Sequence, residues 1–509
     1  MQNYDWIESC EPEEQGIPSH AINWFFDQAE REELDIHSIQ IVRNGKMVVD
    51  AVALPFTHDS FHRIFSAAKG LVATAVLFAV QDGFYSLDEK VIPRIPRNWL
   101  PENLDPMWEE LTLYHLLTMN TGHDQDTLFQ MWGKSECWVR TFFEVRPAHH
   151  PGTFFCYDMG AQYVMNEMIR LASGKDTGQY LHEKLFSKLG IEYQVNYTEP
   201  EKHFFSSTIQ LKPDALTKLS LFYLQNGKWK GEQILDSTLA ECLGKRHSPS
   251  RHYDYVRSGQ FDNLGGYGLH MWRNPLGGYR FAGGQGQFGI VIPEEQLVIS
   301  VLAGEHRSGR IFDLILEALY SEMYRGCVPV IPEESRERKR RLSTWNLAPG
   351  MISDRSSMAE KIDGVVYRMD KNETGTDQIS FRFLEDQAEI CIIQNGKEHV
   401  YPCGLNGHWA ESRQGYLMME SDPDHIEDLD RNFHCDTHTI LLSGGWAATD
   451  IFTFSLRSAS LLCEYRFYCQ FTDAEIVVTR PWNDYLKRTE RRSMHFTDPK
   501  KKMYGKRTE

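Results

Sequence analysis

A serine and a lysine stand three positions apart in the segment Phe65–Val76, which reads FSAAKGLVATAV. The alanine-rich run after Ser66 favours a helix, and residues three apart on a helix share one face, so the Lys69 ammonium can lie beside the Ser66 hydroxyl. An amine in that place can take the serine proton, and the free N–H groups at a helix start favour an oxyanion. The pattern therefore predicts an activated serine nucleophile. An N-capping serine beside a solvated lysine is the alternative, since Ser-x-x-Lys also arises by chance.

A tyrosine that could serve as a base follows much later in the chain. Tyr157 comes after Pro151-Gly152 and just before a predicted helix. A phenolate stabilised by a nearby ammonium can accept a proton. We expect Tyr157 to be this base, and a half-buried structural tyrosine is the alternative.

A glycine-rich segment, Phe281–Phe288, leads into a predicted strand. Glycines at a strand edge let a developing oxyanion come close to a main-chain N–H group. The segment is therefore a candidate second half of an oxyanion hole, although a hairpin bulge would use the same residues.

Two groups of predicted strands must position these residues. Ile39–Val49 contains two alternating apolar runs joined by Asn44-Gly45, which predicts a hairpin. A second strand pair is predicted at 288–292 and 297–302, with an amphipathic segment after it at 311–323. The chain between them is mostly helical in pattern, with helices that end at Asp82-Gly83 and at Gly174. We expect an α/β (α+β) domain whose antiparallel sheet is built from both ends of the domain, with helices on both faces and a helical subdomain inserted between.

The remainder of the chain has the short strands and frequent turns of a small all-β barrel or sandwich. A charged stretch near 331–341 is a candidate linker, and an exposed helix on the first domain is the alternative. The predicted boundaries are 1–328 for the first domain, 329–358 for the linker, 359–485 for the all-β domain, and 486–509 for a basic, disordered tail.

Composition restricts the class of protein. The 509 residues carry a formal net charge of −17, which argues against a nucleic-acid partner. The sequence has no signal-peptide pattern at its start and no apolar run long enough to span a membrane, and its ten cysteines are scattered, so we expect a cytoplasmic protein without a membrane partner. No metal is expected, because the candidate histidines lack metal-ligand spacing and are predicted to be structural: His115, His123, His149 and His150.

The order and context of these motifs resemble the serine β-lactamase and penicillin-binding-protein superfamily, and within it the serine hydrolases related to class C β-lactamases. The resemblance covers about residues 10 to 325. It rests on the following segments: 41–46, the Ser-x-x-Lys helix, 83–91, 111–123, Pro151-Gly152 ahead of Tyr157, 185–191 and 267–269.

The resemblance implies a β-lactamase/DD-peptidase-like fold, with Ser66 as the nucleophile, Lys69 as its proton-handling partner and Tyr157 as the base. It also implies an oxyanion hole made by the N–H groups of Ser66 and of an edge-strand residue. An ungapped alignment puts Phe281-Ala282-Gly283 on the family's Lys-Thr-Gly triad and makes Gly284 the second donor. A shifted register would use Gln285 or Gln287. By analogy with similar chains, the appended domain should be a lipocalin-like barrel.

Two departures from the family pattern bear on the substrate. Met159 stands where the tyrosine motif usually has an asparagine, and Phe281 stands where a lysine would bind a substrate carboxylate. Both favour neutral, apolar substrate groups, and disfavour penicillins and wall peptides. We therefore expect a cofactor-independent serine hydrolase for small esters, amides or peptides. A homo-oligomer is one assembly open to it. Two alternatives remain. One is a catalytically weak or inactive binding protein, and the other is a penicillin-binding protein, β-lactamase or D-aminopeptidase.

Overall fold

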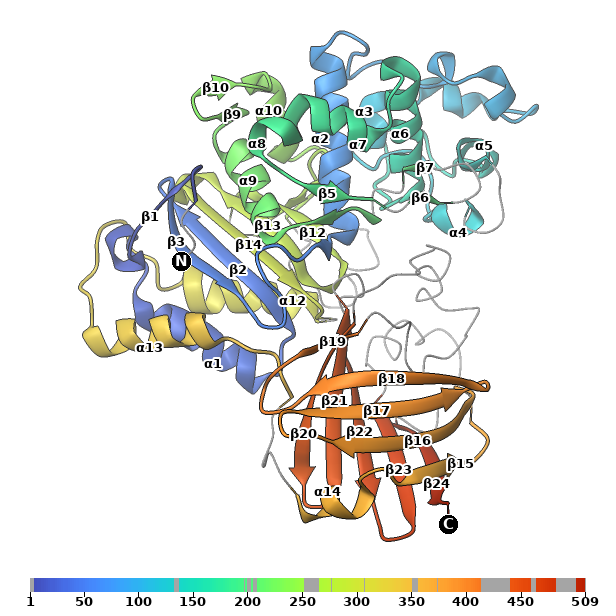
Figure 1. The fold of residues 1–509 in the computed structure, drawn as a ribbon. Helices are drawn as coiled ribbons and strands as arrows, with labels where there is room; N and C mark the ends of the chain where they lie inside the picture. Colours follow the sequence, from blue (N-terminus) through green and yellow to red (C-terminus); the bar gives the residue numbers. More distant parts are fainter. Residues whose placement is uncertain are drawn as a thin grey trace. The chain divides into compact units, whose positions relative to one another are not determined.

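The computed structural model describes residues 4–131, 137–195, 197–198, 203–204, 208–250, 265–275, 277–305, 307–349, 356–372, 374–412, 440–458, 464–481 and 500–508. The chain divides into two compact units (Figure 1). The first contains 1–52, 58–303 and 307–343, and the second contains 53–57, 304–306 and 344–509.

The first unit is built on a seven-stranded sheet in the order β1-β3-β2-β14-β13-β12-β11. Its members are β1 (Glu8–Ser9), β2 (Ile36–Arg43), β3 (Lys46–Val52), β11 (Trp272–Arg273), β12 (Tyr279–Gly283), β13 (Gln287–Ile292) and β14 (Leu297–Ala303). β2 pairs antiparallel with β14, so strands from both ends of the unit meet at the centre of the sheet. This confirms the predicted α/β architecture with its discontinuous antiparallel sheet.

The hairpin β2–β3 forms where it was predicted. Its turn residues Asn44 and Gly45 have φ values of 49° and 73°, which suits the two-residue turn that matches strand twist. Every residue of β2 is buried, since helices cover both faces of this part of the sheet. Helix α9 (Pro213–Leu224) packs on β2, β13 and β14, and Figure 1 shows α1 (Ser19–Arg31) and α12 (Ser308–Leu314) on the opposite face.

The central helix α2 (Ala68–Gln81) follows the short 3₁₀ turn η2 (Phe65–Ala67), which contains Ser66. Residues 68–79 of α2 are all buried, as its almost continuous apolar sequence requires. The helix ends at Gln81, and Gly83 follows with φ 79°, as the Asp-Gly signal predicted.

The helical insertion packs around α2. Helix α6 (Gly160–Ser173) contacts α2 and is capped by Gly174 with φ 71°, again as predicted. The other helices and turns of the insertion are η3 (Ile92–Arg94), η4 (Arg97–Trp99), η5 (Pro106–Glu110), α3 (Leu113–Leu117), α4 (Leu128–Met131), α5 (Trp138–Glu144), α7 (Thr177–Leu181), η6 (His182–Phe186), α8 (Ser187–Leu189) and α10 (Ser237–Gly244).

The second unit is a β-barrel, which confirms the predicted small all-β fold. Nine strands close into a ring through a pairing of β18 with β20, and β19 (Ala410–Ser412) pairs beside β20. The nine are β15 (Val366–Met369), β16 (Thr376–Phe383), β17 (Gln387–Gln394), β18 (Lys397–Gly404), β20 (Ile440–Ala448), β21 (Ile451–Ser458), β22 (Tyr465–Phe471), β23 (Glu475–Pro481) and β24 (Lys500–Arg507). Alternate side chains fill the interior with an apolar core that includes Phe381, Trp446 and Phe452.

Two boundary expectations differ from the structure. The stretch expected as a linker contains helix α13 (Pro332–Thr344), which is tied to α1 because Asn23 Nδ2 donates to Glu334 and the buried Arg338 donates to Ser19 Oγ at 2.9 Å. The alternative, a helix on the first domain, therefore holds for this segment.

The expectation of a disordered basic tail is wrong for residues 500–507. These residues form β24, which pairs with β23 and β15. Met503 and Gly505 are the inward positions, while the exposed Lys502, Tyr504 and Lys506 alternate with them, so the basic composition hides a strand period. The rest of that expectation, for 482–499, lies outside the described residues.

Candidate active site

Ser66 and Lys69 come together as predicted. Lys69 Nζ donates to Ser66 Oγ at 3.0 Å, and Lys69 is only 1% exposed, whereas Ser66 is partly exposed. The preceding residue, Phe65, has φ 45°, a left-handed value that is strained for a bulky side chain, and the guanidinium of Arg63 lies 4.6 Å over its ring. The strained residue turns the chain so that Ser66 enters the helix at its first turn, where backbone N–H groups lack acceptors within the helix.

Tyr157 lies on the other side of the lysine. Lys69 Nζ is 4.8 Å from the centroid of the Tyr157 ring, which is a cation–π distance. The ring also stacks on Trp272 of β11, with centroids 5.6 Å apart and planes at 19°. Tyr267 meets Trp272 edge to face at 4.8 Å. Lys69 thus contacts both the serine and the tyrosine, and two aromatic rings fix the orientation of Tyr157.

The strand that carries the third motif passes against the nucleophile turn. A methyl group added to Gly283 would lie 2.1 Å from Ile64 O and 3.1 Å from Ala67 N, so only glycine permits this approach. The neighbouring Gly284 faces Phe65, whose ring would be 3.8 Å from the same added group. The backbone at Gly284 therefore runs beside the turn of Ser66, where the family pattern expects the second oxyanion donor.

Gln285 and Gln287 have different positions in the turn η9 (Gly284–Gly286) and its exit. Gln285 has φ 60° and makes the kink of the turn. Gln287 is fully buried, and its Nε2 donates to the carbonyl oxygens of Gly284, Gln285 and Ala303. The Gln287 amide is thus occupied in holding the turn, and its side chain offers no donor to a substrate.

Phe281 is buried, which differs from the expectation that its side chain would meet the substrate and favour apolar groups. It is 1% exposed, and an added methyl at Gly70 would lie 2.5 Å from its ring. The ring therefore fills the space between β12 and α2. Side chains alternate along a strand, so Phe281 and Gly283 share one face of β12. The register that brings Gly283 to the serine therefore turns Phe281 toward the helix.

The loop that carries Tyr157 is held by a buried carboxylate that the sequence did not single out. Asp158 is fully buried and accepts from Thr127 N at 3.0 Å, Thr127 Oγ1 at 2.7 Å and Gly160 N at 2.9 Å. His123 Nδ1 lies 2.9 Å from its other oxygen. Burial raises the pKa of Asp158, but the hydrogen bond and charge of His123 and the bonds from Thr127 outweigh burial and hold that pKa below its usual value.

A second carboxyl, Asp126, stands beside the same loop. Its Oδ1 accepts from Leu128 N and from Met159 N, both at 3.0 Å. Burial and the charge of Asp158 raise the pKa of Asp126 to about 7, while Lys69 and the backbone N–H groups act in the opposite direction. Met159 is partly exposed at the start of α6. An aspartate placed two residues before Leu128 is a helix-cap pattern that the sequence shows. Its position next to Met159 depends on tertiary structure.

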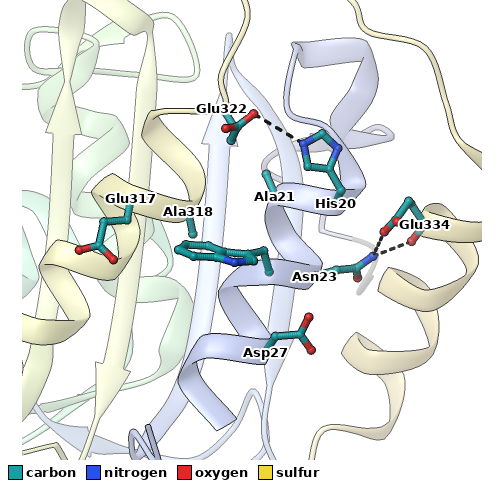
Figure 2. Close-up of a pocket in the computed structure, with 9 residues that line it drawn as sticks. His20, Ala21, Asn23, Asp27, Glu317, Ala318, Glu322 and Glu334 are labelled. Atoms are coloured by element: carbon teal, nitrogen blue, oxygen red, sulfur yellow. Dashed lines mark hydrogen bonds and ion pairs between the residues drawn. The ribbon is translucent and has the colours of Figure 1, made fainter. Parts of the chain in front are cut away.

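A separate cavity of about 380 Å³ lies in the first unit among α1, η11 (Ile315–Tyr320) and α13 (Figure 2). His20 pairs with Glu322 at 3.6 Å, and Asn23 donates to Glu334 at 2.7 Å. Its lining consists of His20, Ala21, Asn23, Trp24, Asp27, Glu317, Ala318, Glu322 and Glu334. None of the predicted catalytic residues lines this cavity, so its position does not alter the assignment of the site at Ser66.

Two structural features bear on partners. Within the described residues, no helix has the length and apolar character needed to span a membrane. The same part of the chain contains no cluster of three or more His, Cys, Asp or Glu residues placed to hold a metal ion.

The chain is similar to several known proteins. A family model described as Beta-lactamase matches residues 26–318. An uncharacterized protein of Alkalihalophilus pseudofirmus is 22% identical over 227 residues, 42% of this chain and 66% of its own length, so the match spans just under two thirds of that relative.

Solved structures of low identity are similar to parts of the chain. EstCE1, a hydrolase with promiscuous acyltransferase activity, is 16% identical with a TM-score of 0.49, covering 59% of this chain and 97% of its own. The octameric penicillin-binding protein homologue from Pyrococcus abyssi is 15% identical with a TM-score of 0.45, covering 90% of this chain and 97% of its own.

Proposed function

Because the chain belongs to the beta-lactamase family, with the family model matching residues 26–318, we propose that it is a serine hydrolase that cleaves small esters or amides through an acyl-enzyme on Ser66. One observation carries the proposal. Lys69 Nζ is 3.0 Å from Ser66 Oγ and 4.8 Å from the centre of the Tyr157 ring, so the nucleophile and both proton-handling groups form one contact chain.

In the first step, Ser66 Oγ attacks the substrate carbonyl carbon, and the serine proton passes to the Lys69–Tyr157 pair. As an amine, Lys69 can accept that proton. As an ammonium, it donates to Ser66 Oγ and stabilises the developing alkoxide while the phenolate form of Tyr157 accepts the proton. The N–H groups of Ser66 and Gly284 are the proposed donors to the tetrahedral oxyanion.

In the second step, the bond from carbon to the leaving oxygen or nitrogen breaks, and the pair returns the proton to the departing alcohol or amine. Water then attacks the Ser66 ester, and the pair takes a proton from that water. The bond from the acyl carbon to Ser66 Oγ breaks, the pair returns the proton to Ser66 Oγ, and the acid product leaves. This sequence needs no cofactor.

The departures from the family pattern support an esterase or amidase rather than a β-lactamase or penicillin-binding protein. Phe281 replaces the cation that would bind a substrate carboxylate, and it is buried against α2. The two arginines closest in sequence are engaged elsewhere: Arg280 is fully buried and donates to Asn274 Oδ1 at 3.1 Å, and Arg273 donates to Gly244 O at 2.6 Å. The cytoplasmic location and any self-association stay predictions.

Turnover tests the proposal. Purified protein is incubated with p-nitrophenyl acetate and p-nitrophenyl butyrate, and with a β-lactam, for the wild type and for Ser66→Ala. We expect ester turnover that Ser66→Ala abolishes, and no accumulation of a penicilloyl adduct. Equal turnover by the two proteins would refute the assignment of Ser66. A stable penicilloyl adduct would instead support the penicillin-binding alternative, and an inactive wild type would support a binding protein.

A further inference from the structure

Asp126 presents a fixed carboxyl next to the tyrosine motif. Two backbone N–H groups, from Leu128 and Met159, donate to the same oxygen, Oδ1. Met159 comes two residues after Tyr157 and replaces the amide that the family pattern places there. The carboxyl is thus anchored on the loop of the proposed base by one oxygen. A carboxylate has acceptor capacity on both oxygens, and among the described residues Oδ2 accepts no hydrogen bond, so this acceptor remains available.

The charges around Asp126 leave it without a full counterion. Asp158, fully buried in the loop before α6, carries a like charge. Lys69 on α2 is the opposite charge, but its ammonium already contacts Ser66 and Tyr157. The Tyr163 hydroxyl on α6 also feels the charge of Asp126. A partly buried carboxyl beside another carboxylate gains most from an additional cation.

Apart from Lys69 and Arg63, the charged groups described around Tyr157 are the carboxyls Asp126 and Asp158, whereas a site that binds a substrate carboxylate needs a further cation. The triad position that would supply a cation holds the buried Phe281. Arg63 lies over the Phe65 ring and has further interactions, and it is the described cation besides Lys69 that could reverse this balance. The acceptor without a hydrogen bond among the described residues is Oδ2 of the partly buried Asp126.

We propose that Asp126 Oδ2 is a substrate-binding carboxylate and that the preferred substrates are esters or amides whose acyl part carries an ammonium group. This inference rests on the proposed function, because it assigns the substrate class of the Ser66 site. The stacked rings of Tyr157 and Trp272 provide an aromatic surface for the methylene groups of such a substrate. The apolar preference expected from Met159 is then restricted to the part of the substrate between the carbonyl and the ammonium.

The experiment compares acyl groups of equal size. Hydrolysis of the p-nitroanilides of β-alanine and 4-aminobutyrate is measured beside those of butyrate and pentanoate, in which a methyl replaces the ammonium, and beside the succinyl p-nitroanilide as an anionic analogue. The proteins are the wild type, Asp126→Asn and Asp124→Asn. Asp124 is an exposed carboxylate on the same loop and serves as the matched control.

We expect the wild type to prefer an ammonium substrate over its neutral partner by at least about tenfold in kcat/KM, or about 1.4 kcal/mol. Asp126→Asn keeps the acceptor for the two N–H groups but removes the charge, so this ratio should fall toward one, while Asp124→Asn should keep the wild-type ratio. For the ammonium substrates, kcat/KM should fall as pH decreases through about 7, because protonation of Asp126 removes its charge. Asp126→Asn should lack this pH-dependent difference between the two substrate classes.

Three results would overturn the inference: no preference for the ammonium substrates, a preference for the succinyl analogue, or a preference that Asp126→Asn leaves unchanged. A preference for the anionic analogue would point to Arg63 instead.

Labelling by a fluorophosphonate separates failure of this inference from failure of the proposed function. If Ser66 is labelled in the wild type and in Asp126→Asn, the site is assembled in both, and only the substrate class is wrong. If neither turnover nor labelling of Ser66 occurs, the proposed function fails, and this inference fails with it.

Discussion

Lys69, at the centre of the site, has two roles. Among the described residues, no neighbouring side chain fills both. Lys69 donates to Ser66 Oγ at 3.0 Å, and its charge lies over the ring of Tyr157. An uncharged side chain of similar length would keep the packing but lose both interactions. The catalytic effect of Lys69 therefore belongs to its amino group rather than to its volume.

Replacing Lys69 with methionine should lower kcat for p-nitrophenyl butyrate by about 10³-fold, within the range of loss seen when an acid–base group is removed. Lys228→Met, at an exposed lysine, is the control and should retain wild-type turnover. Steady-state kinetics with thermal melts checks both variants. Wild-type turnover by a folded Lys69→Met protein would show that the amine takes no part in proton transfer.

The buried pair of Asp158 and His123 should contribute to stability in a pH-dependent manner. Because the pKa of Asp158 is lowered in the fold, its contribution is present above the ordinary carboxyl pKa and is lost as pH falls below about 4. We expect Asp158→Asn to reduce the free energy of unfolding by about 2 kcal/mol at pH 7, by weakening charge-assisted hydrogen bonds, and by less near pH 3. Urea titrations at the two pH values measure this, and a pH-independent difference would contradict it.

At the scale of elements, the site depends on how closely β12 approaches the turn η2. Gly283 allows this approach because its missing side chain leaves room for Ile64 O. The turn η9 then continues beside Phe65, with the Gln287 amide holding its carbonyl groups. Displacement of this strand end would separate the two proposed oxyanion donors without removing either.

Gly283→Ala should therefore impair catalysis more than stability. The added methyl would lie 2.1 Å from Ile64 O, so the strand end or the turn must shift. Loss of one donor costs about 10²-fold or more in kcat. Gly326→Ala is the control, because no atom lies within 4 Å of its added methyl. A Gly283→Ala protein with unchanged kcat would argue against an oxyanion hole at this strand.

The local parts of this arrangement could be predicted from the sequence, and the parts that depend on distant contacts could not. The Ser66–Lys69 contact follows from a spacing of three across the turn η2 and the start of α2, and the β2–β3 hairpin follows from Asn44-Gly45. Asp126 and Asp158 each have one partner two residues away, but the contacts that join the two loops are with residues more than 30 positions away and left no local signal. The burial of Phe281 likewise depends on which face of β12 packs against α2. The motif alone does not predict that face.

At the scale of the whole molecule, the C-terminal residues complete the second unit. β24 lies between β15 and β23 and pairs with both. Its basic residues Lys502, Lys506 and Arg507 are exposed, which explains why composition suggested a tail. The interior of the barrel is filled by apolar side chains, so it is a packed core.

Deletion of residues 500–509 should open the barrel, because it leaves β15 and β23 with unpaired edges. We expect rapid proteolysis within 344–499 and the loss of one unfolding transition, with the first unit retained. Removal of Glu509 alone is the control. Limited proteolysis with intact-mass detection measures the outcome, and an equally resistant truncated protein would contradict the role of β24.

The most direct test of the account is the mass of the Ser66 peptide after reaction with a fluorophosphonate. We expect one adduct per chain on the peptide that contains Ser66, with labelling strongly slowed in Lys69→Met and absent in Ser66→Ala. An adduct on another residue, or equal labelling of the wild type and Ser66→Ala, would contradict the assignment of Ser66 as the nucleophile.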